Sequence, residues 1–202
     1  TVLKVLEIYK KSKDFYIKQK NHLWEKEREI FELYGKNVLI VGCGNIGKEI
    51  AKRFKAFGTN IKAVDIAPVN CEYIDSYEHI NNLTSAIENS DIVILTLPLT
   101  DETKGIINKN CFDVMKKSSI LVNISRGQVI KEADLVDALE NKQIYGAALD
   151  VFQDEPLSEN SRLWDLENVL ITPHNAFVGE GNSERMFDVL CNNLKVFIGG
   201  IQ

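Results

Sequence analysis

Three polar side chains that could perform acid–base chemistry lie directly after short apolar runs. Arg126 belongs to "NISRG", Glu155 to "DVFQDEPL" and His174 to "TPHNA". Arginine offers a bidentate fork to a carboxylate, and imidazole is the usual proton donor near neutral pH. A carboxylate beside an imidazole orients it and stabilises its charged form. The trio therefore predicts a site at which Arg126 holds an anionic substrate, His174 is the general acid and base, and Glu155 tunes His174.

Each of these residues also has an ordinary structural explanation. Arg126 could be a surface arginine in a turn, Glu155 a solvated loop acid, and His174 a histidine whose hydrogen bonds go to the backbone. Asp150, which follows the run "AAL", could cap the next turn. The functional interpretation is favoured because ligands of open α/β sheets bind beyond the carboxyl ends of the strands, and all four residues follow an expected strand.

A glycine-rich loop, "GCGNIG", lies between an expected strand and an amphipathic helix. Gly42 permits the tight turn, Gly44 lets the backbone approach a pyrophosphate, and Gly47 lets helix and strand pack closely. Asp65 ends the next apolar run, where its carboxylate can accept from a ribose 2′-hydroxyl and would repel a 2′-phosphate. The following "IAPVN" supplies no basic side chain, so NAD is favoured over NADP. The alternative is a glycine turn with an unrelated aspartate.

The apolar runs that must position these residues are continuous rather than alternating. This pattern is typical of strands buried on both faces of a parallel sheet. The expected strands span 37–41, 61–64, 92–95, 120–122, 147–149 and 169–171.

Amphipathic segments separate the expected strands. The segment 47–58 and the preceding Ile46 place Ile46, Ile50, Phe54 and Phe57 on one stripe, and Gly58 suits a C-terminal cap. Two further helices are expected over 132–140 and 183–200, the second ending at Gly199-Gly200. Strands and helices that alternate in this way predict an α/β fold with a Rossmann-type doubly wound parallel sheet.

The first part of the chain differs in texture from the rest. Residues 1–34 contain neither glycine nor proline, and apolar residues recur at roughly helical spacing. We expect one long helix, broken near Asn21 and followed by an arm. The division is therefore an N-terminal helix and arm over 1–33 and an NAD-binding Rossmann domain over 34–202.

Composition limits the classes of function. The chain of 202 residues has 45% hydrophobic residues and a net charge of −5, with no basic block that would indicate nucleic-acid binding. No apolar run approaches the roughly 20 residues that span a bilayer. The four cysteines form no CxxC pair, which predicts no metal site and a cytoplasmic setting. Cys43, inside the glycine loop, is either a thiol activated by the helix dipole or simply a small residue.

Five stretches together resemble the NAD-binding domain of the D-isomer-specific 2-hydroxyacid dehydrogenases. They are "YGKNVLIVGCGNIGKEIAKRF", "LTLPLTDETKGIIN", "LVNISRGQVIKEADLVDAL", "GAALDVFQDEPL" and "NVLITPHNAF", in the family's order, between Tyr34 and Gly199. The resemblance implies that Arg126, Glu155 and His174 are the catalytic residues, with His174 also beside the cofactor.

The same resemblance implies further cofactor contacts. It places Asp150 near the nicotinamide carboxamide, Pro98 and Thr103 on the adenosine side, and the backbone of Asn45 and Ile46 at the pyrophosphate. It also implies that residues 1–33 are the family's hinge helix and dimerisation arm, and that the protein is a homodimer with a 2-hydroxy or 2-keto acid substrate. The composition predicts no nucleic-acid or membrane partner.

The resemblance covers the cofactor domain alone, and we expect the substrate domain of the family to be missing from these residues. The isolated chain should then bind NAD with little or no turnover. Two other interpretations stay open. One is a non-catalytic, NAD-sensing module of the same fold. The other is a relative of alanine dehydrogenase or adenosylhomocysteinase, which would explain "GCGNIG" and Asp65 but not the later motifs in their order.

Overall fold

The computed structural model describes residues 1–199 and contains one seven-stranded sheet with the order β3-β2-β1-β4-β5-β6-β7. Every neighbouring pair of strands runs parallel. The strands are β1 (Asn37–Val41), β2 (Asn60–Asp65), β3 (Ser76–His79), β4 (Ile92–Leu95), β5 (Ile120–Asn123), β6 (Gly146–Leu149) and β7 (Val169–Ile171). Chain order reverses between β1 and β4, which is the switch point where α/β sheets bind ligands.

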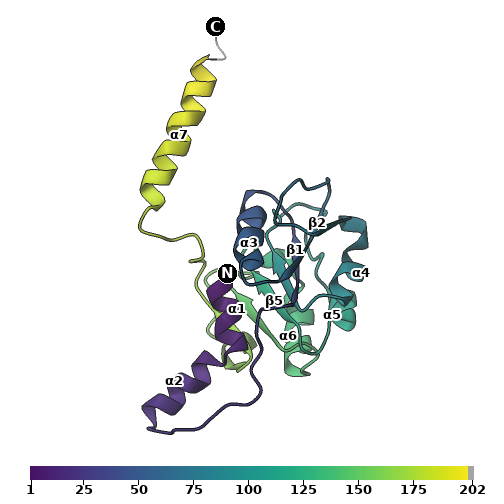
Figure 1. Ribbon diagram of the computed structural model, residues 1–202, viewed down its shortest axis with the longest axis vertical. Coiled ribbons are helices and arrows are strands. Elements are labelled where there is room, and N and C mark those ends of the chain that lie inside the picture. The colour runs from purple at the N-terminus through teal and green to yellow at the C-terminus, as the bar shows by residue number, and fades with distance from the viewer. Residues whose placement is uncertain (200–202) are drawn as a thin grey trace.

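Helices cover both faces of the sheet, as the continuous apolar strands require (Figure 1). One face carries α1 (Val2–Tyr9) and α3 (Asn45–Lys55) over one buried cluster, and the other carries α4 (Leu83–Glu88), α5 (Lys109–Val114) and α6 (Glu132–Glu140) over a second. The predicted α/β doubly wound Rossmann-type sheet is confirmed. Short 3-10 helices occur at η1 (Ile80–Asn82), η2 (Gly127–Val129) and η3 (Arg162–Asp165).

The sequence predicts one long N-terminal helix, and the structure has two. A break at Lys10 and Lys11, where Lys11 adopts φ 50°, separates α1 from α2 (Ser12–Lys20). The predicted break near Asn21 is where α2 ends and the arm begins. The reason is packing: α1 buries Val5 and Tyr9 against the sheet, whereas α2 buries no residue. Burial of an amphipathic face, rather than propensity, supplies most helical stability.

Two further details differ from expectation. Strand β3 is absent from the expected set because "SYEH" is short and polar, as suits an exposed edge strand. On α3, Ile50 and Phe54 are buried as expected, but Ile46 is 60% exposed and Phe57 is 43% exposed. Ile46 therefore belongs to the open end of the helix and not to its core stripe. Gly58 closes the turn after α3 with φ 72°.

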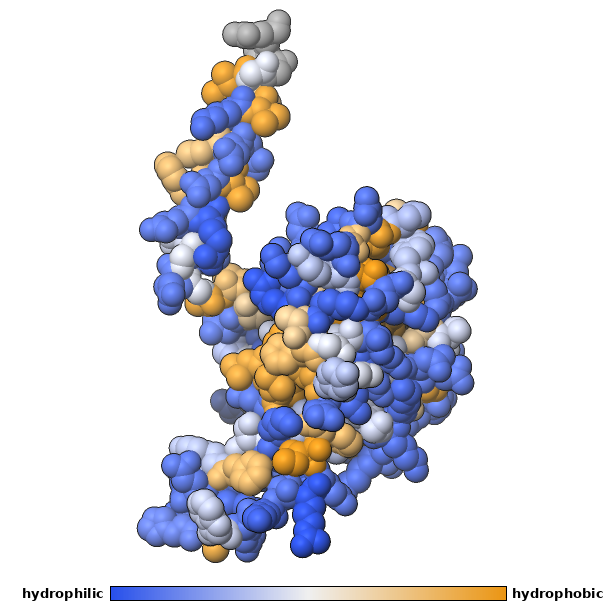
Figure 2. Space-filling view, viewed as in Figure 1, coloured by the Kyte–Doolittle hydropathy of each residue, from blue (hydrophilic) through white to orange (hydrophobic). Residues whose placement is uncertain are grey.

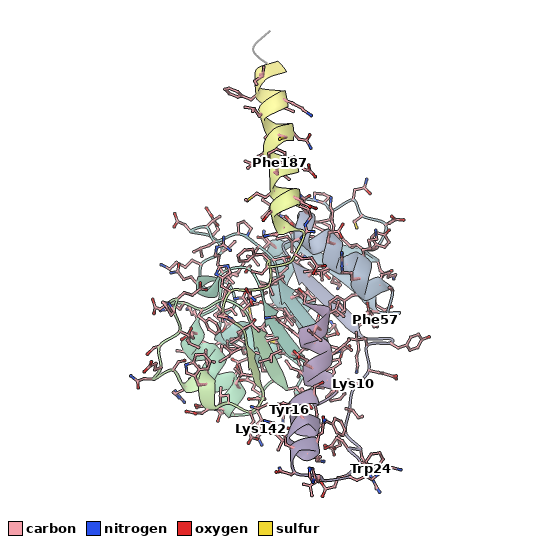
Figure 3. All side chains as sticks on the ribbon, turned by 90° about the vertical axis from the view of Figure 1, so that its left-hand side faces the viewer. Lys10, Tyr16, Trp24, Phe57, Lys142 and Phe187 are labelled. Atoms are coloured by element: carbon pink, nitrogen blue, oxygen red, sulfur yellow. The ribbon has the colours of Figure 1, made fainter. Side chains whose placement is uncertain are left out.

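The last helix, α7 (Asn182–Gly199), extends away from the sheet domain and buries none of its residues (Figure 1). Apolar side chains such as Phe187 and Phe197 are more than half exposed along it (Figures 2 and 3). The predicted helix end at Gly200 and domain end at residue 202 lie outside the described residues. Within residues 1–199, none of the helices is both long and apolar enough to span a membrane.

Gly127 gives the fold its tightest backbone approach. A Cβ at this position would lie 1.8 Å from the carbonyl carbon of Phe152. We expect Gly127→Ala to lower the free energy of unfolding by about 3 kcal/mol, since overpacking against backbone cannot be relieved by a rotamer change. Urea denaturation followed by circular dichroism measures this.

Gly44→Ala is the matched control, because a Cβ on Gly44 meets nothing within 4 Å. Equal stability of the two variants would contradict the expectation.

Candidate cofactor and catalytic site

The glycine loop is built at the switch point between β1 and β4. Gly42 has φ 85°, and a Cβ there would lie 2.6 Å from the Cα of Leu97, just beyond β4. The backbone N–H of Thr96 donates to the carbonyl oxygen of Val41 over 2.9 Å. A Cβ on Gly47 would lie 2.8 Å from the carbonyl oxygen of Gly42. Both glycines thus have the steric roles expected from the motif.

The open side of this loop faces the N-terminus of α3. Gly44 has no atom within 4 Å of its Cβ position, and among the described residues no side chain caps the helix. The backbone N–H groups at Asn45 and Ile46 belong to the first turn, whose donors have no partner inside a helix. Free donors and the positive end of the helix dipole suit an anion. The loop therefore fits a dinucleotide pyrophosphate.

Asp65 lies beside this loop at the carboxyl end of β2. Its Oδ2 accepts from the backbone N–H of Cys43 over 2.6 Å, and its Oδ1 accepts from that of Ile66 over 2.7 Å. These bonds fix the carboxylate next to the glycine loop. Cys43 is 3% exposed, and burial raises the pKa of its thiol to about 11. This favours the small-residue explanation over a dipole-activated thiol.

Pro98 and Thr103 lie in the loop after β4, on the other side of the switch point. The Thr103 hydroxyl donates to the carbonyl oxygen of Pro98 over 2.7 Å and accepts from the backbone N–H of Thr100 over 2.7 Å. Hydrogen bonds within the loop therefore hold it in one conformation beside the glycine loop. This position suits the predicted adenosine contacts, which stay a prediction.

His174 and Glu155 form a direct pair between two loops. His174 Nδ1 lies 2.8 Å from Glu155 Oε2, and the two side chains are 39% and 36% exposed. Glu155 Oε1 accepts from the backbone N–H of Phe152 over 3.0 Å. His174 itself adopts φ 49°, a left-handed conformation that is uncommon away from glycine. The pair leaves Nε2 of the imidazole as the nitrogen that can meet a substrate.

The ionisation of Glu155 follows from these contacts. Partial burial raises the pKa of Glu155, but the hydrogen bonds from His174 and the Phe152 N–H outweigh it. The charges of His174 and Arg126 act in the same direction, so the pKa lies below its ordinary value. Glu155 is therefore a carboxylate at neutral pH and can accept from the imidazole.

Arg126 is held by the turn that follows β5. The fully buried Asn123 donates from Nδ2 to the carbonyl oxygen of Arg126 over 2.9 Å and accepts from the backbone N–H of Ser125 over 3.0 Å. The Arg126 guanidinium donates to the Ser125 carbonyl oxygen over 2.7 Å. Guanidinium carries five N–H donors, and Arg126 is exposed, so it can also bind a carboxylate.

Asp150 is 1% exposed and organises the histidine loop. It accepts from the backbone N–H of Asn175 over 3.1 Å and of Ala176 over 2.8 Å, and also from the Thr172 hydroxyl. The ammonium of Lys4 lies 3.1 Å from Oδ1. Burial raises the pKa of Asp150, but these hydrogen bonds outweigh it and keep the pKa below its ordinary value. The carboxylate caps a distant loop rather than the next turn, and its nicotinamide contact stays a prediction.

The sequence did not single out Lys4, Thr172 or Asn123. The signal for Asn123 and Thr172 is a polar residue that closes or directly follows an apolar strand run. For Lys4 it is a lysine on the otherwise apolar segment "VLKVL". Each signal is weak alone, because such residues are usually exposed.

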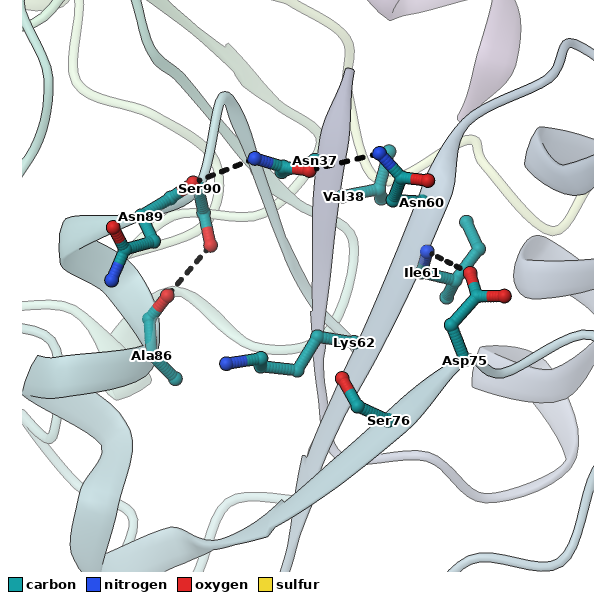
Figure 4. A pocket seen from close by; sticks show the side chains of 10 residues that line it. All are labelled: Asn37, Val38, Asn60, Ile61, Lys62, Asp75, Ser76, Ala86, Asn89 and Ser90. Carbon is teal, nitrogen blue, oxygen red and sulfur yellow. Dashed lines mark hydrogen bonds between the residues drawn. The ribbon is translucent and has the colours of Figure 1, made fainter. Parts of the chain in front are cut away.

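A hollow of about 210 Å³ lies at the amino ends of β1 and β2, the opposite edge of the sheet (Figure 4). Asn60 Nδ2 donates to Asn37 Oδ1 over 3.2 Å, and the Ser90 hydroxyl donates to the carbonyl oxygen of Ala86 over 2.7 Å. None of the predicted site residues lines it.

Comparison with known proteins agrees with this geometry. A family model described as D-isomer specific 2-hydroxyacid dehydrogenase, NAD binding domain, matches residues 2–176. Glyoxylate reductase of Pyrococcus horikoshii is 38% identical over 172 residues, covering 84% of this chain and 51% of that protein. The chain thus spans about half the length of the curated relatives it matches.

Two solved structures with bound cofactors share the fold. One is D-isomer specific 2-hydroxyacid dehydrogenase from Lactobacillus delbrueckii ssp. bulgaricus in its NAD complexed form, with TM-score 0.83 and 28% identity over 98% of this chain and 65% of that one. The other is NADPH-dependent glyoxylate/hydroxypyruvate reductase from Sinorhizobium meliloti with NADP and sulfate, with TM-score 0.87 and 27% identity over 98% of this chain and 63% of that one.

The Asp65 carboxylate should discriminate between the two dinucleotides. We expect NADH to bind the chain more tightly than NADPH by at least about tenfold, or roughly 1.4 kcal/mol, because a 2′-phosphate would meet this negative charge. Asp65→Asn keeps an acceptor for the backbone N–H of Cys43 and should lower the ratio of the NADPH to the NADH dissociation constant. Titration calorimetry with both dinucleotides gives the two dissociation constants.

Glu72→Gln, at an exposed acid in the loop after β2, is the control and should leave the ratio unchanged. If Asp65→Asn left the ratio of the two dissociation constants unchanged, Asp65 would not discriminate between a ribose 2′-hydroxyl and a 2′-phosphate.

Proposed function

The chain belongs to the D-isomer specific 2-hydroxyacid dehydrogenase family through its NAD binding domain, and we propose that the whole protein is an NAD(H)-dependent oxidoreductase that interconverts D-2-hydroxy acids and 2-keto acids. The observation that supports this most strongly is the His174–Glu155 pair, with its separation of 2.8 Å. A carboxylate at Nδ1 orients the imidazole and leaves Nε2 available for proton transfer, as a general acid and base requires.

The proposed chemistry assigns one task to each of three side chains. Arg126 binds the substrate carboxylate through its guanidinium fork. His174 gives a proton to the carbonyl oxygen during reduction and takes it back during oxidation. Glu155 orients the imidazole and compensates its positive charge. When bound, NADH supplies the hydride that reduces the carbonyl carbon.

We also assign the cofactor contacts to this chain's residues. The backbone at Gly44, Asn45 and Ile46 would hold the pyrophosphate and Asp65 the adenosine ribose. Pro98 and Thr103 would line the adenosine side, and Asp150 and His174 would lie at the nicotinamide end. NAD is preferred over NADP because of Asp65. A cytoplasmic setting is part of the proposal and is supported by four cysteines that are all free thiols.

Replacement of the histidine tests the assignment. In the full-length protein, His174→Gln should lower turnover of a 2-keto acid with NADH by about 10²- to 10⁴-fold, the usual contribution of a general acid. Binding of NADH should change little, because the phosphate loop and Asp65 are untouched. Glyoxylate and hydroxypyruvate are suitable first substrates, and stopped-flow oxidation of NADH measures the rate.

His79→Gln is the control, since His79 lies on the edge strand β3, where its side chain accepts from the backbone N–H of Asn81. Normal turnover in His174→Gln would overturn the catalytic role. An unmodified full-length protein that binds NADH and turns over no 2-keto acid would favour the NAD-sensing module.

We further propose that residues 1–34 and the adjacent face of the sheet domain form a homodimer. Apolar side chains gather on the surface over α1 and the neighbouring arm (Figure 2). Trp24 is 98% exposed, Tyr34 is 76% exposed and Leu3 is 67% exposed, and Trp24 extends from the arm into solvent (Figure 3). Exposed apolar patches of this kind are typical of association surfaces.

Sedimentation equilibrium should therefore give about twice the monomer mass of 22.9 kDa. Trp24→Ser together with Leu3→Ser should shift the equilibrium toward monomer by at least about tenfold, because burial of two large side chains is worth several kcal/mol. Trp164→Ser, at a half-exposed tryptophan in η3, is the control. A monomer at high concentration would contradict the proposal.

A further inference from the structure

Lys4 is a buried cation on the N-terminal helix. It is 8% exposed, and lysine is rarely buried unless it is paired. Its ammonium lies 3.1 Å from Asp150 Oδ1 and also donates to the hydroxyl of Thr172. Both partners lie at the carboxyl ends of strands, Asp150 after β6 and Thr172 after β7. The ion pair therefore joins α1 to the edge of the sheet that holds the candidate site.

The Asp150 end of this pair leads directly to His174. The carbonyl oxygen of Asp150 accepts from the backbone N–H of His174 over 2.7 Å. Its carboxylate accepts from the next two N–H groups, those of Asn175 and Ala176, over 3.1 Å and 2.8 Å. The backbone N–H groups of three consecutive residues, 174–176, thus all donate to Asp150. Together they hold His174 in its left-handed conformation of φ 49°.

The charge of Lys4 is one of the contacts that allow Asp150 to keep this role. A carboxylate that is 1% exposed needs a compensating cation or strong donors, because isolated buried charge is unstable. Without the ammonium, the carboxylate keeps the Thr172 hydroxyl and two N–H donors but loses this countercharge, which favours uptake of a proton or of water. A protonated carboxyl gains a donor and loses acceptor capacity, so an N–H of Asn175 or Ala176 would lose its partner and the loop would move.

The helix that carries Lys4 is itself fixed to the domain. Val5 and Tyr9 are 0% and 1% exposed in the same cluster as α3. The ring centroids of Tyr9 and Phe31 lie 5.3 Å apart, and those of Phe31 and Tyr145 lie 4.9 Å apart. The place of the ammonium is therefore set by the packing of α1 and not by a flexible surface side chain.

We propose that Lys4 is a positioning residue for His174, acting through Asp150 and Thr172 and linking the location of α1 to the geometry of the acid–base pair. The catalytic part of this inference rests on the proposed function of His174. The structural part, that Lys4 fixes the loop at residues 172–176, does not.

The test uses Lys4→Met, which removes the charge and keeps an unbranched chain, and Lys4→Gln, which keeps an N–H donor. Lys10→Met is the matched control, because Lys10 is exposed at the end of the same helix (Figure 3). Amide hydrogen exchange and the ring resonances of His174 are followed by NMR in the chain without cofactor. The ring signals are assigned with His174→Gln.

In Lys4→Met we expect the amides of Asn175 and Ala176 to exchange at least about tenfold faster and the His174 ring signals to shift. Amide exchange reports the free energy of local opening, which the loss of Lys4 should lower at this loop. Amides in β1 and β4 should be unchanged. Lys4→Gln should fall between Lys4→Met and the wild type, and Lys10→Met should match the wild type.

In the full-length protein, Lys4→Met should lower kcat by at least about tenfold and leave KM for NADH within about twofold, because a misplaced acid–base group affects the chemical step. Unchanged exchange and unchanged ring signals in folded Lys4→Met would overturn the inference. So would unfolding of both Lys4 variants, which would assign Lys4 to the stability of the whole fold. If the loop moves in Lys4→Met but His174→Gln is fully active, the positioning role stands and the proposed function fails.

Discussion

All strands of the sheet run in one direction, and the rest of the structure depends on this constraint. A parallel sheet brings the carboxyl ends of its strands to one edge, so loops that are far apart in sequence must meet there. That edge holds the glycine loop after β1 and the Arg126 turn after β5. It also holds the Glu155 loop after β6 and the His174 loop after β7. Crossover helices bury both faces, which explains why the strands are apolar without alternation.

Within that edge, one buried carboxylate connects fold and chemistry. Asp150 combines a salt bridge to Lys4 with backbone bonds that shape the His174 loop. Removing water from two charges is costly, and such a pair is tolerated only when further hydrogen bonds satisfy both groups. Here Thr172 and two backbone N–H groups complete the set. The same contacts that keep Asp150 ionised therefore also fix the backbone that presents the imidazole.

The predictable parts of the site are those formed by residues that are adjacent in the chain. The loop at Gly42–Gly47 needs specific residues at fixed spacing, and its strand and helix are adjacent in the chain. The edge strand β3 was not predictable, because its polar residues carry neither alternation nor a continuous apolar run. The break at Lys11 was missed for a related reason. Helical periodicity continues through it, and only the unequal burial of α1 and α2 determines where the helix stops.

The sequence alone therefore determined six of the seven strands, the glycine loop and the types of side chain available for acid–base chemistry, because each depends on local spacing and burial pattern. The tertiary structure decided which of those side chains touch. Lys4 meets Asp150 across 146 residues of chain and Thr172 across 168, and Glu155 meets His174 across 19. No periodicity encodes such contacts, because they follow from the packing of α1 on the sheet and from the order of the strands.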